Sequence, residues 1–63
     1  METNLNDLIT RAPYLKSILE GMVGKYKEDG EKYEITLETK AWFCKSGNFV
    51  FFDFGEFEKR LPL

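Results

Sequence analysis

The feature that most constrains this chain is the run FVFFDF at residues 49–54. A strand with one face in solvent alternates apolar and polar side chains, whereas Phe49, Val50, Phe51 and Phe52 place large side chains on both faces. Both faces of this strand therefore need cover. A chain of 63 residues buries only about 60% of the surface that its unfolded form exposes, so little protein is left to cover the second face.

Composition removes the usual means of stabilising so short a chain. The single cysteine, Cys44, excludes an internal disulfide, and with no histidine a structural zinc site lacks its ligand set. Six Phe, three Tyr and one Trp favour an aromatic core or self-association instead. We expect no metal and no cofactor.

Residues 4–23 predict a helical segment with one apolar stripe. Asn4 and Asp7 have the spacing of a helix N-terminal cap, and Pro13 should break the segment into two short helices. Gly21 and Gly24 are typical stop signals. The stripe is made by apolar residues spaced three and four apart: Leu5, Leu8, Ile9, Ala12, Leu15, Ile18, Leu19, Met22 and Val23.

Two β-hairpins follow the helical segment. Asp29-Gly30 predicts a two-residue turn that sets Tyr26 opposite Tyr33. A second turn at Ser46-Gly47 predicts the pairs Cys44–Phe49, Phe43–Val50, Trp42–Phe51, Ala41–Phe52 and Lys40–Asp53. We therefore predict a single α+β domain over residues 1–63, with the helical segment packed on a small antiparallel sheet of two consecutive hairpins. We expect residues 58–63 to fray.

The two faces of the predicted sheet are both apolar. If the strand continues from Leu37 without a bulge, one face holds Tyr33, Ile35, Leu37, Ala41, Phe43, Val50, Phe52 and Phe54. The helical stripe can cover that face. The opposite face then carries Trp42, Cys44, Phe49 and Phe51, and these four residues are the candidate partner-binding site.

Several ways of covering the second face stay open. Phe57, Leu61 and Leu63 of the tail can fold back over Trp42 and Phe51. A bulge near Thr39 would exchange the two faces. Otherwise a second copy of the chain, as a homodimer, or another molecule must cover the patch, because each large side chain left in water forfeits about 1.5–3 kcal/mol.

Catalysis is not expected. Cys44 has no histidine to activate it, and a small apolar role in the strand explains it better than a nucleophilic one. Neither a phosphate-binding nor a dinucleotide-binding glycine motif is present. Five carboxylates form either a solvated face or an acidic surface that imitates nucleic-acid phosphates: Glu28, Asp29, Glu31, Glu34 and Glu38.

These observations favour a non-enzymatic protein-interaction module, an inhibitor or adaptor acting on a larger protein as phage-encoded inhibitors of host enzymes do. The alternative is single-stranded nucleic-acid binding, because residues 48–54 resemble the aromatic strands of cold-shock domains, on which bases stack. A net charge of −2 gives no electrostatic footprint for duplex DNA. The sequence shows neither a signal peptide nor a membrane-spanning run, so we expect a cytoplasmic location.

Overall fold

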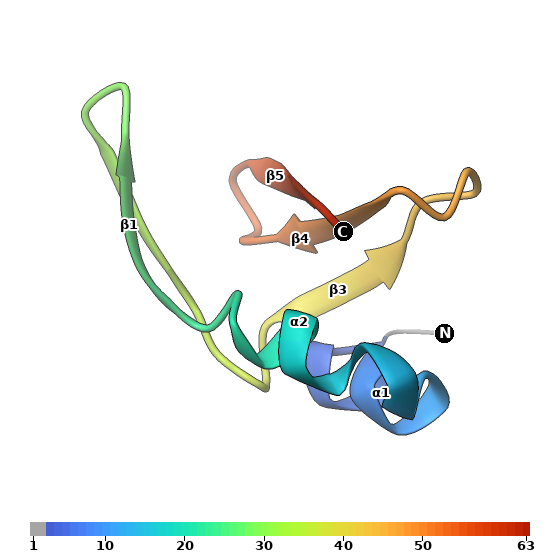
Figure 1. Cartoon of the computed structure of the whole chain (residues 1–63). Coiled ribbons are helices and arrows are strands. Elements are labelled where there is room, and N and C mark those ends of the chain that lie inside the picture. The colour runs from blue at the N-terminus through green and yellow to red at the C-terminus, as the bar shows by residue number, and fades with distance from the viewer. Residues whose placement is uncertain (1–2) are drawn as a thin grey trace.

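The computed structural model describes residues 3–63 and confirms the predicted α+β class (Figure 1). Two short helices and a 3-10 turn precede five strands. In chain order these elements are α1 (Leu5–Arg11), η1 (Pro13–Leu15), α2 (Lys16–Glu20), β1 (Gly24–Glu28), β2 (Glu31–Ile35), β3 (Lys40–Phe43), β4 (Phe49–Asp53) and β5 (Glu58–Pro62).

The helical segment begins and breaks where the sequence predicts. The Asn4 side chain accepts a hydrogen bond from the Asp7 backbone N–H, and the Asp7 carboxylate accepts one from the Asn4 N–H, both at 2.9 Å. This capping box satisfies two N–H groups that a helix start leaves without a partner inside the helix. Pro13 opens η1, where its fixed φ angle suits the first turn of a helix.

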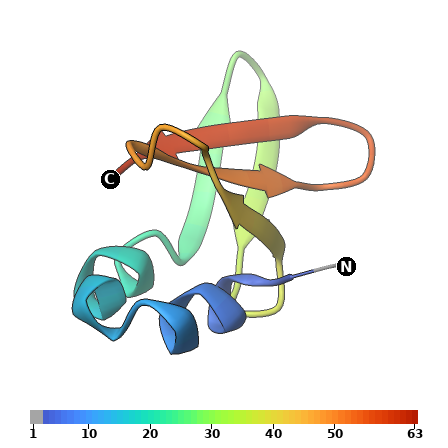
Figure 2. The same cartoon turned by 90° about the vertical axis from the view of Figure 1, so that its right-hand side faces the viewer.

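The strands form two sheets, where we expected one. β1 pairs with β2 in a two-stranded sheet, and β3, β4 and β5 form a second sheet in that order. The register of both predicted hairpins is confirmed, with Tyr26 opposite Tyr33 and Trp42 opposite Phe51. Figure 2 shows the long β1–β2 hairpin standing across the direction of β4 and β5.

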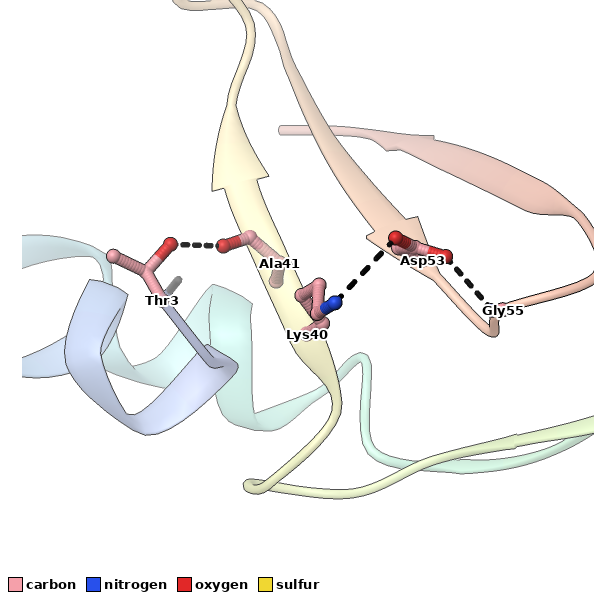
Figure 3. A network of polar contacts seen from close by, with 5 residues as sticks. All are labelled: Thr3, Lys40, Ala41, Asp53 and Gly55. Carbon is pink, nitrogen blue, oxygen red and sulfur yellow. Dashed lines mark hydrogen bonds and ion pairs between the residues drawn. The ribbon is translucent and has the colours of Figure 1, made fainter. Parts of the chain in front are cut away.

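Two local features separate the sheets. A turn follows β2, in which the Thr36 backbone N–H donates to the Thr39 hydroxyl at 2.8 Å. Beyond the turn, the outer edge of β3 is occupied by the start of the chain, because the Ala41 N–H donates to the Thr3 carbonyl at 2.9 Å. Thr3 also donates its hydroxyl proton to the Ala41 carbonyl, as Figure 3 shows. With this edge bonded, β2 cannot extend the sheet at β3.

The core lies between the helices and one face of the β3–β4–β5 sheet. Leu5, Leu8 and Leu19 come from the helices and are at most 1% exposed. They pack with the buried strand residues Tyr33, Ile35, Ala41, Val50 and Phe52. The predicted core face of the strands is therefore confirmed for these residues, and Ala41, 0% exposed, rules out an exchange of faces by a bulge.

Three apolar residues that the sequence pattern assigned to the core are exposed. Leu37 is 42% exposed because it lies in the turn after β2, where its carbonyl accepts the Asn6 N–H at 2.9 Å. The prediction that Leu37 continues the core face of the strand is wrong, since β2 ends at Ile35. Ile18 and Val23 of the helical stripe are also partly in solvent.

The tail forms a strand, so the expectation that it frays is wrong. Residues 58–62 are β5, which pairs along β4 with Leu61 opposite Val50. Phe57, Leu61 and Leu63 pack against the core. The tail thus extends the sheet sideways and contributes to the core face. It does not fold back over Trp42 and Phe51.

Candidate binding surface on the outer face of the sheet

The face of the β3–β4–β5 sheet that points away from the core is built from three rows of residues. Successive residues of a strand point to opposite faces, so the neighbours of the buried Ala41, Val50 and Phe52 point outward. The register aligns these outward residues across β3, β4 and β5. We call them together the outer face: Lys40, Asp53 and Glu58 in the charged row, Trp42, Phe51 and Arg60 in the middle row, and Cys44, Phe49 and Pro62 in the third row.

The aromatic residues of the outer face are held by contacts with their neighbours. The rings of Trp42 and Phe51 stack, with their centroids 5.7 Å apart and an interplanar angle of 18°. The Arg60 guanidinium lies over the Phe49 ring, 4.9 Å from its centroid, in a cation–π contact. Trp42, Phe49 and Phe51 are half-buried, while Arg60 is exposed. The four candidate site residues of the sequence analysis therefore lie on one surface.

The charged row borders these rings on one side. The Lys40 ammonium lies 3.9 Å from the Asp53 carboxylate, an ion pair predicted from the sequence and drawn in Figure 3. Asp53 also accepts the Gly55 backbone N–H at 2.7 Å, which holds its carboxylate at the end of β4. Glu58 stands beside Asp53 on β5. Lys40 and Arg60 balance Asp53 and Glu58, so the charges of the outer face sum to zero.

Cys44 is the thiol of the third row. The Ser46 hydroxyl donates a hydrogen bond to the Cys44 sulfur at 3.3 Å. This bond, helped by the positive charge of Arg60, lowers the pKa of the Cys44 thiol. Cys44 is half-buried beside Phe49, at one end of the third row of the outer face.

The rest of the protein packs on the opposite face of the β3–β4–β5 sheet, which is the core face. α1 contacts β3, and its buried Leu5 and Leu8 join Ala41 in the core. Phe57 and Leu61 also pack on the core side. Within residues 3–63, none of the four aromatic and thiol side chains of the outer face belongs to the core cluster.

Arg60 and Glu58 are parts of this surface that the sequence analysis missed. Both stand on the strand that was expected to fray. In the sequence, residues 58–60 are all charged and show no alternation; the alternation appears in the fold, where Glu58 and Arg60 are exposed whereas Lys59 and Leu61 are half-buried. This period of two is typical of a strand with one covered face.

The acidic residues singled out in the sequence do not gather into one surface. The β1–β2 register puts Glu28 and Glu31 on one face of the hairpin and Glu34 on the other. Glu31 forms an ion pair with Lys59, at 3.5 Å. Asp29 lies in the turn, where it has a positive φ of 51°, and Glu38 lies in the separate turn before β3.

An open hollow of about 450 Å³ lies on the β1–β2 hairpin. Its lining contains three exposed lysines and one exposed glutamate beside the stacked Tyr26 and Tyr33: Lys25, Lys27, Lys32 and Glu34. Flexible lysine side chains in solvent fix no ligand geometry. The outer face, in which rings and charges are held by mutual contacts, is the better-defined surface.

Two further features are absent from the described part of the chain. Residues 3–63 contain no group of three His, Cys, Asp or Glu side chains placed to hold a metal ion. None of the helices in this range has the length and apolar character needed to cross a bilayer.

Comparison with protein families, with curated proteins and with solved structures gives no match for this chain. The outer face is therefore the feature from which we infer a function.

Proposed function

We propose that this protein is a non-enzymatic interaction module that binds another protein chain through the outer face. The observation that supports this most strongly is the stacked pair of Trp42 and Phe51. Both rings are half-buried and lie on the face of the sheet opposite the core. Grouped aromatic side chains that stay partly in water are typical of interfaces, because they become fully buried only when a partner binds.

The residue types of the outer face fit a protein partner. Trp, Phe and Arg are enriched at the centres of protein interfaces, and Trp and Arg dominate their binding energy. The charged row resembles a polar rim, in which opposite charges give orientation more than affinity. A proteinaceous partner can match the aromatic centre and this rim at the same time.

Single-stranded nucleic acid is the alternative occupant. Three aromatic rings with Arg60 on the same surface favour it, since bases stack on rings and guanidinium groups. Against it, Asp53 and Glu58 occupy the border of the rings and repel phosphates. With zero net charge over the outer face, little of the electrostatic term that drives nucleic-acid binding is left.

An inhibitor or adaptor is the role that fits a module of this size. A chain of 63 residues with one binding face acts by occluding or bridging a larger protein. We further propose a cytoplasmic setting, where the half-buried thiol of Cys44 stays reduced.

Photo-crosslinking tests this proposal directly. A photoreactive phenylalanine analogue replaces Phe51, and irradiation follows in cells that produce the chain. We expect protein adducts from position 51, because this ring lies at the centre of the outer face. The matched control places the same analogue at Tyr14, which is 84% exposed on η1, outside the outer face.

The adducts also distinguish the two occupants. Adducts that proteases degrade and nucleases leave intact support the proposal. Adducts that nucleases degrade would instead assign the surface to nucleic acid. Equal yields from positions 51 and 14 would contradict a dedicated binding face.

A further inference from the structure

We propose that the outer face binds a second copy of this chain, face to face, with a twofold axis that runs parallel to β4. The inference rests on the proposed function, that this face binds protein, and it names a second copy as the partner; because the pairing is reversible, the face of the monomer is open to a larger protein. The supporting observation is the pattern of charges and rings over the three rows. When the outer face is rotated by 180° about this axis, its charges and rings face complementary groups.

The rotation follows from the strand order. β4 is the middle strand, with β3 on one side and β5 on the other. A twofold axis parallel to β4, midway between two facing sheets, keeps every row at its own level and exchanges β3 with β5. Each residue of β3 then faces the residue of β5 in the same row of the second copy, as an isologous interface requires.

Under this rotation, oppositely charged side chains of the two copies face each other, and an aromatic ring faces a cation. In the charged row, Lys40 faces Glu58 of the second copy, and the pair occurs twice by symmetry. In the middle row, Trp42 faces Arg60 of the second copy, the residue types of a cation–π contact. Phe51, at the centre of the face, meets its own copy near the axis.

The charged row carries two like-charged neighbours at the axis. The two Asp53 carboxylates approach one another there, and each lies beside its own Lys40, 3.9 Å away. Two lysines and four carboxylates thus meet across the charged row, and the two Arg60 guanidinium groups of the next row bring the interface to zero net charge. The interface as a whole is neutral, while the charged row keeps an excess of two negative charges.

The other in-plane axis gives no such match. A twofold axis perpendicular to the strands would lay the charged row over Cys44, Phe49 and Pro62 of the second copy. Lys40 and Glu58 would then lose water against apolar side chains without gaining a partner in the second copy, which is costly. Charge complementarity therefore selects the axis along β4.

The size of the face predicts a weak dimer. Three strands spaced about 4.8 Å apart and up to about five residues long give a face of roughly 14 by 17 Å. Two such faces bury roughly 500 Å² together, less than a stable specific interface buries, so the complex should dissociate readily. We expect a reversible monomer–dimer equilibrium.

A charge-swap experiment tests the twofold pairing. Lys40→Glu makes the charged row all acidic, so two copies repel, and Glu58→Lys sets lysines opposite lysines. An equimolar mixture restores both pairs, because the glutamate introduced at position 40 of one variant faces the lysine introduced at position 58 of the other. The unchanged Lys40 and Glu58 then face each other as in the wild type. Sedimentation equilibrium is run on the wild type, on each variant and on the mixture, over one concentration range.

We expect a dimer for the wild type, at least tenfold weaker association for each variant alone, and recovery to within about threefold of the wild type for the mixture. Recovery in the mixture also shows that both variants are folded. A wild type that stays monomeric throughout, variants that associate like the wild type, or a mixture that does not recover would each overturn the inference.

The two proposals fail in different ways. A monomeric protein whose position 51 still cross-links to a different protein keeps the proposed function and removes the second copy as its partner. Absence of specific adducts from position 51 removes both.

Discussion

Replacing Phe52 with alanine is expected to lower the free energy of unfolding by about 3–5 kcal/mol. The Phe52 side chain is 0% exposed and is the largest fully buried one in the core. Small domains have a total stability of roughly 5–15 kcal/mol, and one this short lies near the low end. We expect the variant to keep no more than about 2 kcal/mol of stability and to unfold at a low urea concentration, measured by circular dichroism.

Phe51→Ala is the matched control, because it removes the same side chain from the next position in β4. Phe51 is half-buried on the outer face, where its ring stacks on Trp42. We expect a loss of about 0.8–1.5 kcal/mol, half of what full burial contributes. Equal losses at positions 51 and 52 would show that both faces of the sheet belong to the core.

Replacing Tyr33 with alanine is expected to detach the β1–β2 hairpin from the rest of the protein. The Tyr33 ring stacks on Tyr26 at 5.1 Å and meets Phe54 at 5.0 Å and Phe57 at 6.0 Å. The contacts with Phe54 and Phe57 join the two-stranded sheet to the end of the three-stranded one. We expect a loss of about 3–5 kcal/mol in the free energy of unfolding.

Hydrogen exchange shows where that loss falls. The backbone amides of β1 and β2 should lose protection first, because the hairpin depends on the Tyr33 contacts and an isolated hairpin is marginally stable. Tyr14→Ala, at a tyrosine that is 84% exposed, should leave stability and exchange unchanged. Uniform loss of protection over all strands would contradict a separable hairpin held by the Tyr33 contacts and indicate one undivided core.

Local signals predicted the elements that local interactions build. Asp29-Gly30 adopts positive φ angles of 51° and 81°, as its hairpin turn requires, and so the register of β1 and β2 follows from two residues. The break at Pro13 likewise needs no tertiary contact. The face that carries Trp42 and Phe51 follows from the period of two along the strands.

The features missed by sequence reasoning depend on contacts between distant segments. β5 forms because the edge of β4 that β3 leaves open can hydrogen-bond to residues 58–62. The charges of this segment suggest a solvated tail when the sequence is considered alone. Two sheets form because Thr3 occupies the edge of β3. Arg60 and Glu58 entered the candidate site only with β5, so the self-complementary rows are visible in the fold and not in the sequence.

The most direct test of the outer face as the interface between two copies is sedimentation equilibrium of Trp42→Glu beside the wild type, with circular dichroism on both. If two copies pair through the outer face, the wild type should dimerise reversibly and the variant should be a folded monomer. Trp42 is half-buried in its own chain, so its loss should leave the core intact. A variant that loses the folded spectrum would contradict this, because Trp42 would then belong to the core that holds the monomer together.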